Sequence, residues 1–168
     1  MVGSAYTDKP YGALMLDELE DYQEVIASLS SHIEGGASVG AALHNRGLAH
    51  WEIGEPDQAL QDFDAAARQL PQSHMPFQLK GLLLQKLGRS DEALDAFNRA
   101  VSVSPDQATV RRARALLLRE LGRPGDALKD FEHAIALEPG FARTREDRDA
   151  TLAALAKMSP KPWWMFWR

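Results

Sequence analysis

The stretch ALQDFDAAARQLP, residues 59–71, decides the fold because it returns twice along the chain. It comes back as ALDAFNRAVSVSP at 93–105 and as ALKDFEHAIALEP at 127–139, so the order Ala-x3-Phe-x2-Ala-x4-Pro recurs every 34 residues. Glycines keep the same step, five residues before each block, at Gly54, Gly88 and Gly122. A fixed period of this size is the signature of a repeat architecture, in which one unit cannot bury its apolar side chains alone. We therefore predict stacked helical units.

Composition limits the possible functions. The chain has 168 residues, of which 45% are apolar, a net charge of −5 and no cysteine. These values predict a folded domain and exclude disulfides, thiolate metal sites and cysteine nucleophiles. The acidic balance disfavours nucleic acid as a partner, because nucleic-acid binders carry a basic surface. No apolar run resembles a signal peptide or approaches the roughly 20 residues of a membrane span. We expect a cytoplasmic protein.

The N-terminal part differs from the repeats. Residues 1–12 are predicted to be a flexible lead-in, and residues 13–36 an acidic helix that ends at two glycines. No Phe or Pro stands here in register with the repeat, so we predict an extra helix that packs on the first helix pair or, alternatively, meets the basic third pair. Its apolar residues fall at the helical steps of three and four, namely Leu16, Leu19, Tyr22, Ile26, Leu29 and Ile33.

Glycines and prolines divide the rest of the chain into helix pairs, since glycine favours the position after a helix and proline tolerates the first helical turn. Ser38 and Ser90 are predicted to cap the helices that follow them. The predicted helices lie at about 39–53 and 56–70, 74–87 and 90–103, and 106–121 and 124–137, with a polar capping helix at 142–157. Together with the acidic helix, this gives eight helices.

These residues resemble the tetratricopeptide repeat, whose unit carries small residues at positions 8, 20 and 27, an aromatic residue at 24 and proline at 32. Three consecutive units fit, at 40–73, 74–107 and 108–141. The resemblance implies an all-α solenoid of three helix hairpins with an extra N-terminal helix and a C-terminal capping helix.

Position 7 of the unit departs from the family pattern, because it is basic in all three units. We predict that Arg46 pairs with Asp62 and Arg114 with Asp130, since both acids stand at unit position 23. The middle unit has Ala96 at that position. The alternative is that these side chains are separately solvated charges.

The resemblance also implies a binding surface, because proteins of this family bind peptides or protein segments in a concave groove lined by the first helix of each pair. At one unit position every repeat carries a leucine, which either faces the groove or packs between helices. Arg112 and Arg119 would favour acidic groups at one end. The predicted lining residues are His44, Leu48, Trp51, Gln78, Leu82, Gln85, Lys86, Arg112, Leu116 and Arg119.

One subgroup of the family holds the C-terminal carboxylate of chaperone peptides with a clamp of Lys, Asn and Arg. Other residues stand at those positions here, so this partner class is disfavoured. They are His44, Leu48, Leu79, Thr109 and Ala113.

The tail at 158–168 is rich in aromatic residues, with Trp163, Trp164, Phe166 and Trp167 close together. Three targets remain open for it. The tail folds back on its own repeats or on a second copy, is recognised by another protein, or lies at a membrane interface, where Trp beside Lys or Arg is favourable.

No catalytic motif is present. The five histidines form neither H-x3-H nor H-E-x-x-H, and no phosphate loop or dinucleotide fingerprint occurs, so we expect neither catalysis nor a cofactor. The leading hypothesis is a protein-binding adaptor or scaffold. The alternatives are a dedicated chaperone, because the layout is similar to that of type III secretion chaperones of the translocator class, and a membrane assembly factor anchored by the tail.

Overall fold

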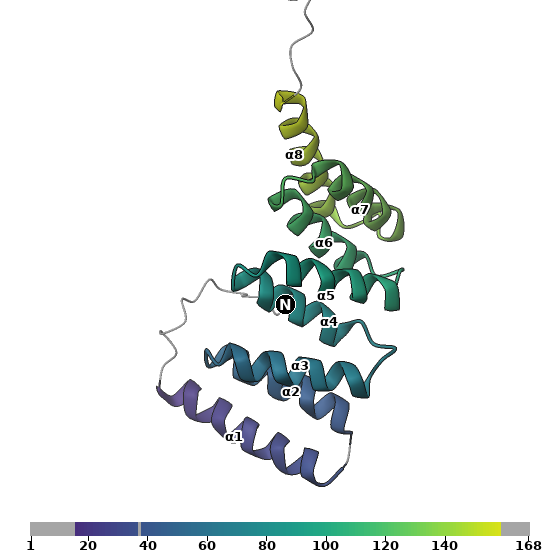
Figure 1. Cartoon of the computed structure of the whole chain (residues 1–168). Helices are drawn as coiled ribbons and strands as arrows, with labels where there is room; N and C mark the ends of the chain where they lie inside the picture. Colours follow the sequence, from purple (N-terminus) through teal and green to yellow (C-terminus); the bar gives the residue numbers. More distant parts are fainter. Residues whose placement is uncertain (1–15, 37, 159–168) are drawn as a thin grey trace, which may run out of the picture. The chain divides into compact units, whose positions relative to one another are not determined.

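The computed structural model describes residues 16–36 and 38–158, and every regular element in these ranges is a helix. The all-α prediction is confirmed. The predicted lead-in and the aromatic residues of the tail lie outside the described ranges. The helices are α1 (Leu16–Glu34), α2 (Val39–Glu52), α3 (Pro56–Gln69), α4 (Met75–Lys86), α5 (Ser90–Val103), α6 (Ala108–Glu120), α7 (Pro124–Leu137) and α8 (Ala142–Met158) (Figure 1).

The chain divides into two compact units, residues 1–83 and 84–168, and the division falls within α4. The N-terminal unit contains α1, α2, α3 and most of α4. The C-terminal unit contains the last turn of α4 and the helices from α5 to α8. Each unit is described by itself below.

Each hairpin turns at a glycine. Gly54, Gly88 and Gly122 have φ values of 80°, 73° and 71°, which suit glycine because it has no Cβ to clash in this left-handed region. The residue after each glycine donates its backbone N–H to a carbonyl five residues earlier, as in Glu55 to His50 at 2.8 Å. Proline then opens the next helix at Pro56 and Pro124. The sequence predicts both features, the glycine at the turn and the proline at the start of the next helix.

The two predicted serine caps are wrong. Ser38 precedes α2 with a left-handed backbone, φ 48°, and its side chain makes no capping hydrogen bond. An N-cap needs an extended backbone for its oxygen to reach the free N–H groups of the first turn, and Ser38 lacks it. Ser90 is already the first residue of α5, and Arg89 precedes it. At this helix start, Arg89 instead forms an ion pair with Glu92 of the first turn, at 2.7 Å.

The core of each hairpin is a buried phenylalanine beside small residues. Phe63, Phe97 and Phe131 are fully buried. In the N-terminal unit α2 comes close to α3 at Gly47, where an added Cβ would lie 2.7 Å from the Phe63 ring. Such contact is too short for any side chain, so only glycine fits there. In the C-terminal unit Ala115 is the equivalent residue and packs in one cluster with Phe131.

Helix α1 packs on α2 and takes the place of a second helix from a preceding repeat. Arg46 donates to Ser30 of α1 at 3.0 Å. Two equivalent contacts join Lys80 to Asp64 at 2.6 Å and Arg114 to Asn98 at 3.0 Å, each across 16 residues. Because Ser30, Asp64 and Asn98 are separated by the repeat step, α1 stands beside α2 in the register of a second helix.

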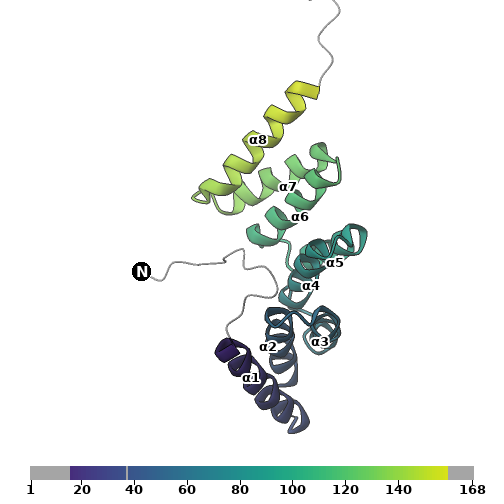
Figure 2. The same ribbon diagram turned by 90° about the vertical axis from the view of Figure 1, so that its left-hand side faces the viewer.

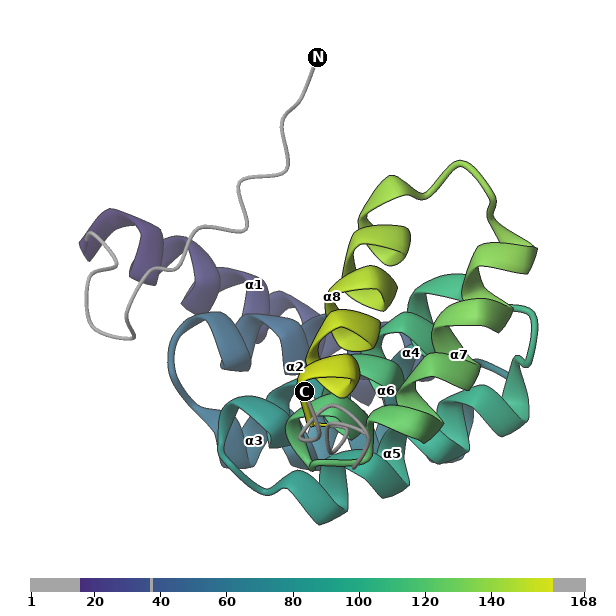
Figure 3. The same ribbon diagram turned by 90° about the horizontal axis from the view of Figure 1, so that it is seen from above.

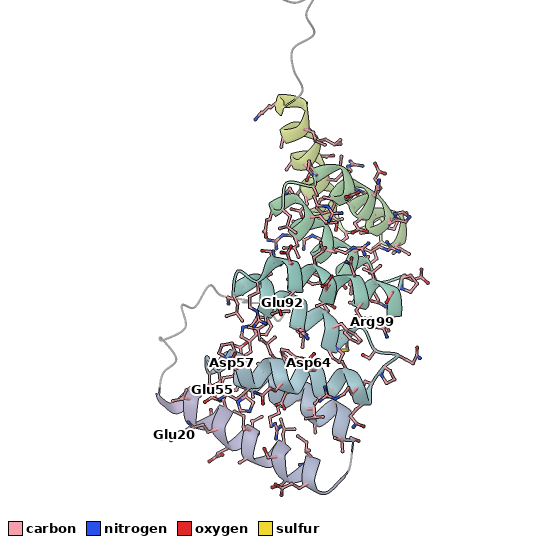
Figure 4. The ribbon with its side chains drawn as sticks, in the orientation of Figure 1. Glu20, Glu55, Asp57, Asp64, Glu92 and Arg99 are labelled. Atoms are coloured by element: carbon pink, nitrogen blue, oxygen red, sulfur yellow. The ribbon has the colours of Figure 1, made fainter. Side chains whose placement is uncertain are left out.

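The direction of α1 agrees with this register. Glu20 marks the early part of α1 and Asp57 the start of α3, and both lie at the same edge of the N-terminal unit (Figure 4). Helix α1 therefore runs in the direction of α3, although its sequence has neither the Phe nor the Pro of the repeat.

Helix α8 packs on α6 and α7 within the C-terminal unit (Figure 2). Its inner face carries Thr144 and Thr151, both fully buried, where α6 carries the fully buried Val110 and Leu117. The Thr151 hydroxyl donates to the Asp147 carbonyl at 2.7 Å. Among the described residues, the Thr144 hydroxyl has no hydrogen-bond partner.

We predict that Thr144→Val raises the free energy of unfolding by about 1 kcal/mol. A buried hydroxyl without a partner loses its hydrogen bonds to water and forms none in their place, whereas valine has nearly the same shape and no hydroxyl. The measurement is the urea midpoint of the full chain. Thr151→Val is the matched control, since it removes a hydroxyl that is bonded, and it should give no gain. Equal effects of the two substitutions would contradict the assignment.

Candidate partner-binding surface

In the N-terminal unit, the predicted surface has an aromatic floor. His44 and Trp51 of α2 are half-buried, and both rings lie 6.4 Å from the ring of Phe63, measured between centroids. The Trp51 ring meets Phe63 edge to face, at 80°, which is a favourable aromatic geometry. Leu48 lies between them on the same helix and is also half-buried. The rings of His44 and Trp51 thus rest on the buried Phe63, and all three side chains keep part of their surface exposed.

The predicted lining residues are shared equally by the two units. Gln78 and Leu82 of α4 are half-buried and belong to the N-terminal unit with the three residues of α2. The other five belong to the C-terminal unit, namely Gln85, Lys86, Arg112, Leu116 and Arg119.

In the C-terminal unit, Arg112 is already bound by the chain itself. Its guanidinium forms an ion pair with Asp147 of α8 at 2.6 Å and lies 5.8 Å from the centre of the Phe141 ring, in cation–π range. The side chains of Arg112 and Asp147 are both largely buried. The acidic group that the sequence analysis expects on a partner is thus supplied by α8 at this position.

Arg119 is placed differently. Its closest partner is the Asp147 carbonyl, at 3.5 Å, and no carboxylate of the described residues lies within ion-pair distance of it. Leu116 packs against the core of the unit, as the alternative interpretation of the leucines predicts. Gln85 donates to Glu120 at 2.6 Å.

Three neighbours of the surface are not predicted from the sequence, namely Asp147, Phe141 and Glu120. A signal for two of them was present, because Asp147 stands 35 residues after Arg112 and Glu120 stands 35 after Gln85. The contact between successive first helices therefore uses the repeat step plus one residue.

Ion pairs join the two helices of the first hairpin and of the third hairpin. Arg46 binds Asp62 with two hydrogen bonds, at 2.7 and 2.8 Å, and Arg114 binds Asp130 with two, at 2.6 and 2.7 Å. Both predicted pairs are confirmed, and both carboxylates are buried. The hydrogen bond that Arg46 donates to Asp62 raises the pKa of Arg46, so this guanidinium stays charged at every pH of interest.

His44 gives the N-terminal unit a pH dependence with a definite sign. Burial lowers the pKa of His44 and also that of His74. The unfolded chain, with a histidine pKa of about 6.5, then binds protons more strongly than the folded chain. The contribution of these two histidines to stability is therefore fully present above that value and is lost as the pH drops through it.

We predict a lower urea midpoint at about pH 5.5 than at about pH 7.5, with the difference reduced in His44→Gln, because glutamine cannot be protonated in this range. The measurement is urea unfolding of both proteins at the two pH values. If His44→Gln shows the full pH difference, His44 does not contribute to it.

A hollow with a volume of about 250 Å³ lies among α5, α6 and α7, apart from the predicted lining residues. Its charged groups are already matched. Arg114 binds Asp130, and Asp126 binds Arg123 and Lys129. The hydrogen bonds from Arg123 and Lys129 lower the pKa of Asp126. This hollow therefore offers a ligand no unmatched charge.

Within residues 16–36 and 38–158, no three potential metal-ligating side chains gather in one place. Among the same residues, no helix is both long and apolar enough to cross a membrane.

Comparison with solved structures finds the same fold. A crystal structure of MamA superposes with a TM-score of 0.73 and 18% identity, over 82% of this chain and 80% of MamA. The first tetratricopeptide domain of Spaghetti (RPAP3), bound to the HSP90 peptide SRMEEVD, gives 0.65 and 20%, over 70% of this chain and 93% of that domain. The first such domain of human RPAP3 gives 0.65 and 19%, over the same shares. No curated protein matches the chain.

Two family profiles, both described as tetratricopeptide repeat, match residues 16–74 and 79–156, and together they cover most of the chain. The first match includes α1, in agreement with the register of that helix. Members of this family act in general as protein-interaction modules. The hairpin turns, the buried phenylalanines and the two profile matches agree, and the chain belongs to the tetratricopeptide repeat family.

Proposed function

We propose that this protein is a non-catalytic adaptor that binds an extended or helical segment of a partner protein along the first-helix face of its repeats. The observation that carries the proposal is the partly exposed surface of His44, Leu48 and Trp51, where the rings of His44 and Trp51 lie against the buried Phe63. Rigid aromatic and aliphatic side chains on a packed floor lose little entropy on binding, which is typical of the energetic centre of an interface.

Charge then suggests the partner's chemistry. Arg119 is a half-buried cation without a carboxylate among the described residues, whereas Arg112 is matched by Asp147. We infer that the N-terminal unit favours apolar side chains of a partner and that the C-terminal unit favours an acidic group. The first tetratricopeptide domain of Spaghetti (RPAP3), bound to an HSP90 peptide, shares the fold, but the clamp residues of that partner class are absent here.

A displayed peptide library, selected on the full chain, tests the proposal. Peptides that bind should lose at least about tenfold in affinity with Leu48→Glu, because a charge on the apolar floor has no partner there. Gln61→Glu is the matched control, since Gln61 is exposed on α3, the second helix of the same hairpin, and it should leave the affinity unchanged. Equal affinities in the two variants would reject the first-helix face.

Arg119→Glu tests the acidic group separately. It should weaken peptides that carry an acidic residue and leave neutral peptides unaffected, because the attraction is between charges. Arg112→Glu confounds this test, since it also breaks the ion pair with Asp147.

The same selection separates the alternatives. A dedicated chaperone would bind one unfolded export substrate and no short peptide. A membrane assembly factor would bind lipid vesicles, and it would lose this binding without the tail.

A further inference from the structure

One face of α8 is uncovered within the described structure. Helix α8 stands in the register of a first helix, because Thr144 and Thr151 occupy the places of Val110 and Leu117. In the complete hairpins the next position is closed. Leu118 of α6 is 5% exposed and packs in one cluster with Ala127 and Phe131 of α7. Leu152 of α8, one repeat step later, is 47% exposed.

Within the described part of the chain, the arginine of α8 at unit position 7 also lacks the buried carboxylate partner that this position has in the first and third hairpins. Arg46 and Arg114 stand at unit position 7 and bind a buried carboxylate on the second helix. Arg148 is the equivalent residue of α8, and among the described residues its carboxylate partner is its neighbour Asp149, which is largely exposed. Figure 3 shows α8 from above, in yellow. We call Arg148 and Leu152 the open face of α8.

We propose that residues 159–168 dock on the open face of α8 and take the place of the missing second helix. In the first and third hairpins, the segment that covers this face is the helix that follows the first helix after a short turn, α3 after α2 and α7 after α6. Residues 159–168 follow α8 directly, so the chain order of the other hairpins selects them. This inference does not depend on the proposed peptide site.

The composition of the segment suits the role. Pro160 and Pro162 oppose continuation of the α8 helix, because proline has no N–H and restricts the residue before it. Ten residues reach up to about 33 Å, and Leu152 lies only about 9 Å back along the helix from Met158. The segment carries apolar rings to cover Leu152 and to stack on Arg148, as Phe141 stacks on Arg112. These rings belong to Trp163, Trp164, Phe166 and Trp167.

Disulfide trapping tests the proposal, because the chain has no cysteine of its own. The full chain with Leu152→Cys and Met165→Cys keeps all four rings of the segment. The matched control replaces Leu152→Cys by Ala154→Cys, since Ala154 is exposed but lies two residues on, about 200° around the helix. Mild oxidation should give at least about fivefold more intramolecular disulfide with position 152, because docking raises the local thiol concentration on that side.

Two other outcomes overturn the proposal. Equal intramolecular yields at 152 and 154 would mean that the segment has no preferred face. A preference for 152 that appears only as disulfide-linked dimers would mean that a second copy covers the open face instead.

Tryptophan quenching gives an independent readout without cysteines. Leu152→Glu should increase acrylamide quenching of the full chain, because the segment's indoles lose their cover. Leu87→Glu is the control, because Leu87 is 42% exposed and lies outside α8. The same quenching in both variants would also overturn the proposal.

Discussion

Replacing Asp130 with alanine should lower the free energy of unfolding by about 2–4 kcal/mol, because it leaves arginine charges without their counterion in a mostly buried site. Asp130 is 4% exposed, receives two hydrogen bonds from Arg114 at 2.6 and 2.7 Å, and lies 3.4 Å from Arg111. The two guanidinium groups keep some contact with water, which places the expected loss below that of a fully buried pair.

Urea unfolding of the full chain measures this loss. Asp126→Ala is the matched control, since Asp126 is also bound by two cations, Arg123 and Lys129, but its side chain is 43% exposed. Its effect should be much smaller, because exposed ion pairs contribute little. If both substitutions cost the same, burial of the Arg114–Asp130 pair is not what stabilises the hairpin.

Phe63→Ala should cost about 3–5 kcal/mol, because it removes a fully buried ring and leaves a cavity that the surrounding helices cannot fill. Gly47 already lies as close to this ring as a backbone can. The ring also supports His44 and Trp51, so the same variant should lose peptide affinity even where it is still folded.

The measurement combines urea unfolding with peptide binding at low denaturant. Phe63→Leu should lose less than half of the stability that Phe63→Ala loses, since it leaves a smaller cavity. Phe141→Ala provides a control, because Phe141 is half-buried and lies over Arg112 rather than in a hairpin core. A loss at Phe63 no larger than at Phe141 would contradict the cavity argument.

Much of the fold could be predicted because the helical period and the repeat step are local properties. The 34-residue step places the glycine turns and the buried phenylalanines, and it also predicts the pairing of Arg46 with Asp62 and of Arg114 with Asp130. These residues face one another inside a hairpin, where the short turn leaves only one register. Such contacts follow from spacing alone.

The surroundings of the candidate surface could not be predicted in the same way. The pairing of Arg112 with Asp147, and the choice between groove and core for Leu116, depend on how successive first helices cross and on which rotamers their long side chains take. The serine caps failed for a related reason, since a cap needs a backbone conformation that residue type does not guarantee.

The sequence by itself determined a tetratricopeptide solenoid with three hairpins and their internal ion pairs, because each of these depends on periodic positions within one unit. Only the tertiary structure decided that α1 stands in the register of a second helix, through Arg46 and Ser30, and that α8 stands in that of a first helix with Leu152 uncovered. The two end helices lack the residues of the repeat, so their places are fixed by packing on their neighbours and not by a pattern of their own.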